Sequence, residues 1–144
     1  MKAEKLDRVH VAVKDMDKAM AFFSKILGTT FSEPLVDDKV GIKVVFSAIG
    51  LELVESTSPD SAFARFIEKR GEGLFSLTFK VPDIEGAIAE YTGRGIRLAA
   101  RTGSPRAREA QFHPKDSFGV SIVLTEYNAV HGAEVAGREA PNNL

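Results

Sequence analysis

The sequence contains no cysteine and no tryptophan, and only three of its 144 residues are histidine. The absence of cysteine excludes a thiol nucleophile, a cysteine-ligated metal ion and any disulfide bond. The histidines, at positions 10, 113 and 131, leave little room for metal binding built on imidazole.

The chain also lacks a large net charge and long apolar runs. Lys plus Arg number 19 and Asp plus Glu number 20, so the net charge is −1. A nearly neutral chain without a basic block lacks the electrostatic features of a nucleic-acid-binding protein. No apolar run approaches the roughly 18 residues of a membrane span, and the charged N-terminal segment lacks the apolar core of a signal peptide. We therefore expect a cytoplasmic protein with neither a nucleic acid nor a membrane as partner.

The chain contains an internal repeat with an offset of 68 residues, because Val13–Phe23 matches Val81–Tyr91. Each copy follows a strand-like run, opens with an aspartate that can cap a helix, and continues with apolar residues at helical spacing. A shorter echo relates Leu51–Glu55 to Ile122–Glu126, and both segments close a half. The matches occur in the same order, so the sequence predicts two similar halves.

The predicted elements follow from these periods. Strands are expected over residues 6–13, 29–32, 41–48, 51–55, 74–81, 97–100, 110–113 and 121–126, and helices over 15–27, 59–70 and 83–94. The helix over 59–70 is expected to begin after a cap at Ser58. The result is an α+β fold with two βαβββ halves, about 5–56 and 74–127, joined by the helix in a single domain, 1–127. Residues 128–144 carry no periodicity, so we expect a mobile tail.

Two βαβββ units in this order resemble the vicinal oxygen chelate superfamily. Its members include glyoxalase I, extradiol dioxygenases, methylmalonyl-CoA epimerase and the bleomycin-resistance proteins. The similarity extends over about residues 5–127 and is greatest to the methylmalonyl-CoA epimerases. It is carried by Leu6–Asp15, Leu51–Val54, Asp60–Gly73 and Phe112–Val120. The resemblance implies a cup-shaped, curved mixed sheet with a divalent metal ion at its base, held by the first and last strands of each half.

Three of the four metal-ligand positions of the family carry unsuitable residues here. The two histidine positions, seven residues before each helix-opening aspartate, are Arg8 and Ser76, and the last glutamate position is Val123. Glu52 alone fits, and His10 shares the face of Arg8 because strand side chains alternate. Arginine remains cationic and valine has no lone pair. Since a catalytic metal site normally keeps about three protein ligands, we expect neither a tightly bound metal ion nor another cofactor.

Each retained polar residue has a functional and a structural interpretation. Arg8 can replace the cation and bind a carboxylate or an enolate-like oxygen, with Glu52 as general base, or the two can form an ion pair that fills an inactive site. His10 can donate a proton or simply form hydrogen bonds in the wall. Ser76 can donate to a ligand oxygen or be a tolerated polar residue, and Val123 is expected to line the same site.

The segment before the last predicted strand offers two further candidates. His113 and Lys115 match a loop of the epimerases, in which Lys115 would meet an acyl-CoA phosphate; the alternative is a tight turn. Phe118 stands where the epimerases usually have glycine. Asp37 lies near a proton-transfer glutamate of the family, but an ordinary turn is favoured there.

Two functions remain open at this point. The first is a methylmalonyl-CoA epimerase-like isomerase that acts without metal on a small carboxylate or acyl thioester, with Arg8 as electrophile and Glu52 and His10 moving the proton. The second is a non-catalytic binding protein of the bleomycin-resistance type. A metal-dependent epimerase would require a slipped strand register. Either way the expected partners are a carboxylate or acyl-CoA-like ligand and a second copy of the chain in a homodimer.

Overall fold

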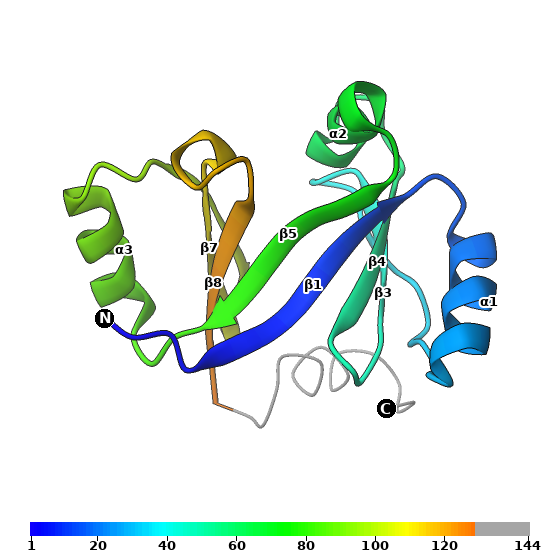
Figure 1. Cartoon of the computed structure of the whole chain (residues 1–144), viewed down its shortest axis with the longest axis horizontal. Helices are drawn as coiled ribbons and strands as arrows, with labels where there is room; N and C mark the ends of the chain where they lie inside the picture. Colours follow the sequence, from blue (N-terminus) through cyan, green and yellow to red (C-terminus); the bar gives the residue numbers. More distant parts are fainter. Residues whose placement is uncertain (129–144) are drawn as a thin grey trace. The chain divides into compact units, whose positions relative to one another are not determined.

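The computed structural model describes residues 1–128, so the tail predicted over 128–144 lies outside the described residues apart from its first position. The elements, shown in Figure 1, are β1 (Lys5–Val13), α1 (Met16–Leu27), β2 (Leu35–Asp37), β3 (Ile42–Phe46), β4 (Leu51–Ser56), α2 (Ala62–Arg70), β5 (Gly73–Lys80), α3 (Ile84–Gly93), β6 (Leu98–Ser104), β7 (Ala107–Phe112), a short 3₁₀ helix (Pro114–Asp116) and β8 (Ser121–Tyr127). The predicted α+β class and the two βαβββ repeats are confirmed.

The chain divides into two compact units. The N-terminal unit is Val9–Phe75, and its strands run in the order β2-β3-β4-β1. In it β1 and β4 are parallel, whereas β3 is antiparallel to both β4 and β2. The helices α1 and α2 both contact β4, and the core between α1 and the sheet is built around Met16, Val45 and Leu53.

The C-terminal unit comprises Met1–Arg8 and residues 76–128, with strand order β5-β8-β7-β6. It repeats the same plan, because β5 and β8 are parallel and β7 is antiparallel to β8 and β6. Helix α3 packs on β7 and β8. The start of β1 is tied to this unit by a 2.8 Å hydrogen bond from the Glu4 N–H to the Lys80 carbonyl.

The two repeat helices begin in the same way. The side chain of Asp15 accepts from the Lys18 N–H, and that of Asp83 accepts from the Gly86 N–H, each at 3.0 Å. Both aspartates have extended backbone, as helix-capping residues do. Gly28 ends α1 in the left-handed conformation, with its N–H bonded to the Ser24 carbonyl. The repeat found in the sequence therefore corresponds to a repeated local structure.

Two predicted boundaries are wrong. The strand expected over residues 29–32 is only an isolated bridge between Phe31 and Ser47, and β2 begins at Leu35. The Ser32 hydroxyl accepts from the Phe46 N–H, so a side chain takes the place of a ladder carbonyl, and Pro34 has no N–H to continue a ladder.

The second wrong boundary is the start of the helix predicted over residues 59–70. The Ser58 carbonyl and hydroxyl are used in a turn, where they accept from the N–H groups of Ser61 and Asp60. The cap is instead Ser61, whose hydroxyl accepts from the Ala64 N–H at 3.0 Å, so α2 begins three residues after Pro59.

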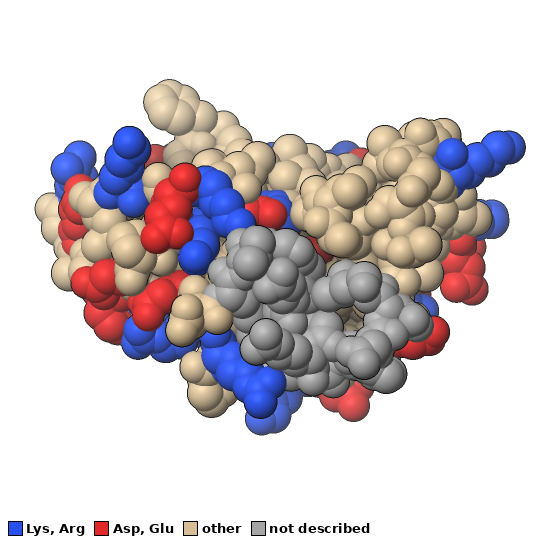
Figure 2. Space-filling model, turned by 90° about the horizontal axis from the view of Figure 1, so that it is seen from below, with Lys and Arg blue, Asp and Glu red and all other residues tan. Residues whose placement is uncertain are grey.

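The residues between the predicted strands 97–100 and 110–113 form a longer β6–β7 hairpin instead of a loop. Arg101 makes a bidentate pair with Glu85 of α3 at 2.8 and 2.9 Å, and Arg108 pairs with Glu126 of β8 at 2.7 Å. Figure 2 shows the acidic and basic side chains interleaved over this unit. The positive charges of Arg101 and Arg108 on this hairpin are thus largely neutralised.

The longest helix described, α1, has 12 residues. Within residues 1–128, no helix combines the length and apolar character needed to cross a bilayer.

Candidate functional site

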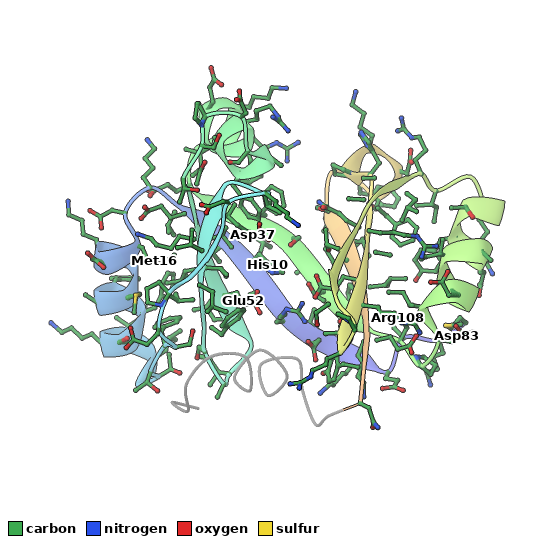
Figure 3. All side chains as sticks on the ribbon, turned by 180° about the vertical axis from the view of Figure 1, so that it is seen from behind. His10, Met16, Asp37, Glu52, Asp83 and Arg108 are labelled. Carbon is green, nitrogen blue, oxygen red and sulfur yellow. The ribbon has the colours of Figure 1, made fainter. Side chains whose placement is uncertain are left out.

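His10 and Glu52 form a close pair in the N-terminal unit. Parallel pairing of β1 with β4 makes them direct register partners, so both side chains leave the sheet on the same face. Nε2 of His10 lies 2.6 Å from Oε2 of Glu52, and the two side chains are only 15% and 6% exposed. Figure 3 shows the two residues adjacent on β1 and β4. The sequence identified both residues as candidates but did not predict their direct pairing.

This pair can hold and move a proton. Imidazole titrates near neutral pH, and a neighbouring carboxylate fixes the orientation of the ring. At 2.6 Å the two groups are within hydrogen-bonding distance of each other. Restricted exposure strengthens their interaction because the surroundings are less polar than water. The chemistry available here is therefore general acid–base catalysis.

Arg8 belongs to a cluster in the C-terminal unit. Its Nη1 lies 2.7 Å from Oδ2 of Asp7, and its Nη2 donates to Glu109 of β7. The hydroxyl of Tyr127 donates to the other oxygen of Asp7. The guanidinium is therefore held by carboxylates on two strands, and its positive charge is balanced locally.

Asp7 is the most buried acid of this cluster, with a side chain only 1% exposed. Burial by itself would raise the pKa of its carboxyl group. The hydrogen bonds from Tyr127 and Arg8, together with the charges of Arg8 and Lys5, outweigh burial, so the pKa of Asp7 lies below its ordinary value. Asp7 is thus ionised at neutral pH and fixes the position of Arg8.

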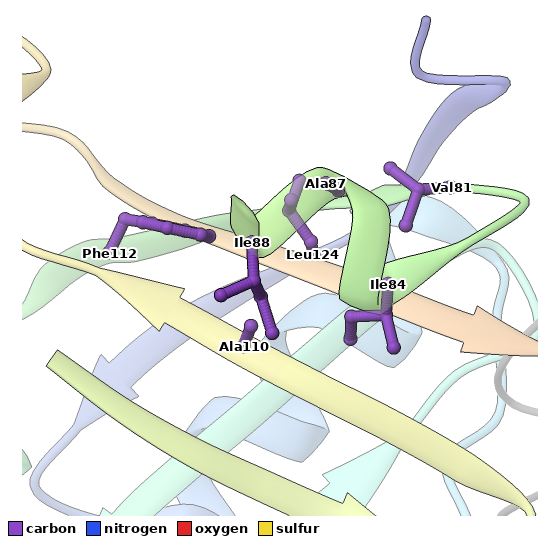
Figure 4. Close-up of a cluster of buried hydrophobic side chains, with 7 residues drawn as sticks. All are labelled: Val81, Ile84, Ala87, Ile88, Ala110, Phe112 and Leu124. Carbon is purple, nitrogen blue, oxygen red and sulfur yellow. The ribbon is translucent and has the colours of Figure 1, made fainter. Parts of the chain in front are cut away.

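The sheet of the C-terminal unit has two chemically different faces. The face toward α3 carries the apolar core shown in Figure 4: Val81, Ile84, Ala87, Ile88, Ala110, Phe112 and Leu124. The opposite face carries Ser76 and Thr78 of β5, paired with Ser121 and Val123 of β8. The candidates Ser76 and Val123 therefore share this face on neighbouring strands, but two residues apart in register.

This face does not offer a donor set for a divalent cation. Ser76 and Val123 are both buried, and Val123 has no donor atom. Arg8, the third altered position, is cationic. Within residues 1–128, no group of three or more His, Asp and Glu side chains is placed to hold a metal ion. The residues at the positions that the resemblance implies for metal ligands thus do not supply the donor set of such a site.

In the loop before β8, the His113 side chain and the Lys115 backbone N–H form a hydrogen bond that stabilises the local backbone. Nδ1 of His113 accepts from the Lys115 N–H at 3.2 Å, so His113 caps the 3₁₀ helix. The Lys115 side chain is exposed.

Asp37 is also exposed. Its carboxylate accepts from the Lys39 and Val40 N–H groups, so these residues form the turn favoured by the sequence.

Sequence reasoning missed Asp7, Glu109 and Tyr127. Glu109 lies 101 residues from its partner Arg8, and Tyr127 lies 120 residues from Asp7. The one available signal was energetic: an arginine on a half-buried strand requires a carboxylate partner. That argument gives the type of partner but not its position.

Comparison with known proteins agrees with the fold just described. Residues 7–113 match the Glyoxalase/Bleomycin resistance protein/Dioxygenase superfamily. The repeated βαβββ arrangement is that of a glyoxalase-like protein. The chain belongs to this superfamily, and within it the chain is methylmalonyl-CoA epimerase-like.

One similar relative is the mitochondrial methylmalonyl-CoA epimerase of Bos taurus, 31% identical over 129 residues that cover 85% of this chain and 74% of the relative. Among solved structures, a variant of Streptomyces coelicolor methylmalonyl-CoA epimerase in complex with 2-nitronate-propionyl-CoA has a TM-score of 0.80 and 26% identity, covering 89% of this chain and 100% of that one. A methylmalonyl-CoA epimerase in complex with methylmalonyl-CoA and NH4+ has a TM-score of 0.81 and 27% identity, covering 90% and 99%. The homodimer and the cytoplasmic location stay predictions.

Proposed function

We propose that this protein is an epimerase-like isomerase that moves the α-proton of a small carboxylate or acyl thioester without a resident metal ion. The observation that carries the proposal is the His10–Glu52 pair, with 2.6 Å between Nε2 and Oε2. The relatives named as methylmalonyl-CoA epimerases, and the complex with methylmalonyl-CoA, support an acyl-CoA thioester as the substrate class.

The proposed reaction is a proton transfer in which no electron is gained or lost overall. The C–H bond next to the thioester carbonyl breaks, its proton passes to the His10–Glu52 pair, and the electron pair delocalises onto the carbonyl oxygen as an enolate. The enolate carbon is planar. Return of a proton to its opposite face re-forms the C–H bond with inverted configuration.

Arg8 would stabilise the negative oxygen of the enolate. It lies two residues before His10 in β1, on the same strand face. Because Asp7 and Glu109 hold its guanidinium, little reorientation is needed when charge develops on the substrate. The negative charges of Asp7 and Glu109 also reduce the attraction of the Arg8 guanidinium for a free anion. Arg8 is therefore better suited to donate an oriented hydrogen bond than to bind anions from solution.

In the C-terminal unit, the face of the sheet that points away from α3 carries buried hydroxyl groups. These groups are consistent with a polar ligand. Ser76, Thr78 and Thr125 are all at most 2% exposed. In the part of the chain that is described, the hydroxyl oxygens of Thr78 and Thr125 have no hydrogen-bond partner, which is unusual for buried groups. We propose Ser76 and Val123 as members of the ligand-binding wall.

The test is exchange of the α-proton of methylmalonyl-CoA in D₂O, followed by NMR on protein treated with a chelator. Unaltered protein is expected to catalyse exchange, and Glu52→Gln and His10→Gln to lower the rate by about 10²- to 10⁴-fold. Glu68→Gln, an exposed change in α2, is the matched control and should retain the full rate.

Arg8→Gln should slow exchange while leaving the His10–Glu52 pair in place. Exchange that disappears with the chelator and returns with Co²⁺ would contradict the proposal. Ligand binding without any exchange would point instead to a non-catalytic binding protein.

A further inference from the structure

Helix α1 exposes apolar side chains on the face that points away from its sheet. Its inner face packs on the core of the N-terminal unit through Met16, Met20 and Phe23. On the outer face, Phe22 is 57% exposed and Ile26 is 55% exposed. These two residues are four apart, so their side chains are neighbours on the helix surface. Figure 1 shows α1 at the outside of the N-terminal unit.

The internal repeat provides a comparison for this outer face. With the offset of 68 residues, Phe22 and Ile26 correspond to Glu90 and Arg94 at the C-terminal end of α3. Glu90 and Arg94 form an ion pair at 2.8 Å, which is an ordinary arrangement for solvent-exposed residues four apart. Two helices with the same local plan therefore differ in the character of their outer faces. The fold does not require apolar residues here, which points to a role in binding.

The apolar surface continues beyond the end of α1. Leu27, the last residue of the helix, is 49% exposed, and Ile49 in the β3–β4 turn is 61% exposed. The hydroxyl oxygens of Thr29 and Ser47 lie 2.6 Å apart, and the Ile49 N–H donates to the Ser47 hydroxyl at 3.4 Å. These bonds hold the turn beside the end of α1. Single exposed apolar residues are common, but several in one region are typical of an interaction surface.

The Phe22 ring has an ordered position on this surface. It makes an edge-to-face contact with Phe23, with 5.2 Å between the ring centroids and 78° between the ring planes. Phe23 in turn packs against the core. Because a ring with restricted freedom loses little further entropy on binding, Phe22 is suited to anchor an interface.

The outer face of α1 also carries exposed charges of both signs. Asp17 and Lys25 each lie four residues from the exposed Ala21, on opposite sides along the helix, and within the described residues neither has an ion-pair partner. In an antiparallel pair of α1 helices with a two-fold axis at Ala21, Asp17 of each copy lies opposite Lys25 of the other. Lys18, the other charge of this face, then lies opposite Ser24 and meets no like charge. The face is therefore complementary to itself in charge.

We propose that the outer face of α1 forms an interface with the same face of a second copy of the chain. Phe22 and Ile26 form its apolar core, and the small Ala21 side chain lets the two helices approach closely. The proposal assigns a specific surface to the homodimer expected from the sequence. It favours a second copy over an anionic membrane, which would repel Asp17. It involves the N-terminal unit alone and does not depend on the proposed function.

The test transfers the outer face of α3 onto α1. Phe22→Glu together with Ile26→Arg reproduces the Glu90–Arg94 pair, so the helix keeps a favourable pair of residues four apart. In sedimentation equilibrium the unaltered protein is expected to be a dimer. The double variant should raise the dimer dissociation constant at least about 30-fold, because a two-fold interface loses each anchor twice. Phe118→Glu changes an exposed phenylalanine of the C-terminal unit and is the matched control, which should remain dimeric.

Charge reversal tests the antiparallel arrangement. Asp17→Lys and Lys25→Asp should each weaken the dimer about 2- to 30-fold, since each exposed pair occurs twice in the interface. The loss should be greatest at low salt. Asp17→Lys combined with Lys25→Asp restores opposite charges across the interface and should recover the affinity of the unaltered protein.

Three outcomes would overturn the inference. The first is a monomeric unaltered protein at high micromolar concentration, including one that binds phosphatidylglycerol vesicles through Phe22, which would assign the face to a membrane. The second is a dimer that the Phe22→Glu and Ile26→Arg variant leaves intact. The third is a combined charge reversal that fails to recover the affinity lost in the single reversals. Circular dichroism checks the fold of each variant, and the charge reversals decide the question if the double variant does not fold.

Discussion

The carboxylate of Glu126 in β8 accepts a hydrogen bond at 2.7 Å from the backbone N–H of Ile84, the first residue of α3. Glu55 in β4 makes the same contact at 2.6 Å with the N–H of Met16, the first residue of α1. Each half thus uses a glutamate near the end of its last strand to satisfy a free N–H at the start of its helix. The echo between Leu51–Glu55 and Ile122–Glu126 therefore has a structural cause.

Removing either glutamate should destabilise the fold. Glu126→Ala leaves the Ile84 N–H without its acceptor and breaks the pair with Arg108, so we expect a loss of about 1–2 kcal/mol in the free energy of unfolding. Glu126→Gln keeps an acceptor oxygen and should lose less. Urea denaturation measures both, and Glu55→Ala tests the equivalent contact in the other half. Equal stability of Glu126→Ala and the unaltered protein would show that the contact contributes nothing.

The Asp7–Tyr127 hydrogen bond should make stability depend on acid pH. The pKa of Asp7 is lower in the folded protein than in the unfolded chain, so the ionised group stabilises the fold above about pH 4. This contribution is lost as the pH falls through the folded-state pKa. Tyr127→Phe removes a donor and should raise that pKa, so that its destabilisation is largest near neutrality and smaller in acid.

Unfolding free energies at pH 7 and at several acid pH values check this sign. Tyr91→Phe is the control, because Tyr91 packs beside Phe112 in the core of the same unit and does not contact Asp7. A Tyr127→Phe effect that stays constant across the pH range would show that the hydroxyl does not influence the titration of Asp7.

The expected metal independence can be tested directly. We expect unaltered protein to bind no Co²⁺ at micromolar concentrations, because Arg8, Ser76 and Val123 do not supply ligands. Visible absorption and calorimetry on chelator-treated protein measure this binding. Stoichiometric Co²⁺ binding by the unaltered protein would contradict the prediction of metal independence.

The sequence predicted what depends on local patterns. Asp15 and Asp83 indicated where two helices begin, since a capping residue acts on N–H groups within its own turn. The resemblance identified Arg8, Ser76, Glu52 and Val123 as equivalent to ligand positions. It could not predict that His10 and Glu52 would be register partners, because alternation fixes the face of a side chain but not the alignment of two strands.

The larger errors have a common physical origin. The sequence predicted no strand between residues 100 and 110, but the β6–β7 hairpin extends through this segment, where Arg101 pairs with Glu85 and Arg108 with Glu126. The Ser58 cap failed because the Ser58 hydroxyl accepts from the Asp60 N–H within the preceding turn, whereas the Ser61 hydroxyl accepts from the Ala64 N–H and caps the helix. In each case the outcome depended on partners that propensity and periodicity do not identify.

Phe118 allows the energetic cost of an exposed, left-handed phenylalanine to be measured. Phe118→Gly and Phe118→Ala both remove a ring that is 104% exposed, but only glycine also relieves the cost of φ at +57°. We expect Phe118→Gly to be more stable than Phe118→Ala by about 1 kcal/mol in urea denaturation. Gly119→Ala, with φ at +82°, is the reverse control and should be destabilised. If Phe118→Gly proved the less stable of the two, the backbone at this position would be unstrained. The expected order would instead show that a residue other than glycine at position 118 carries a cost in stability.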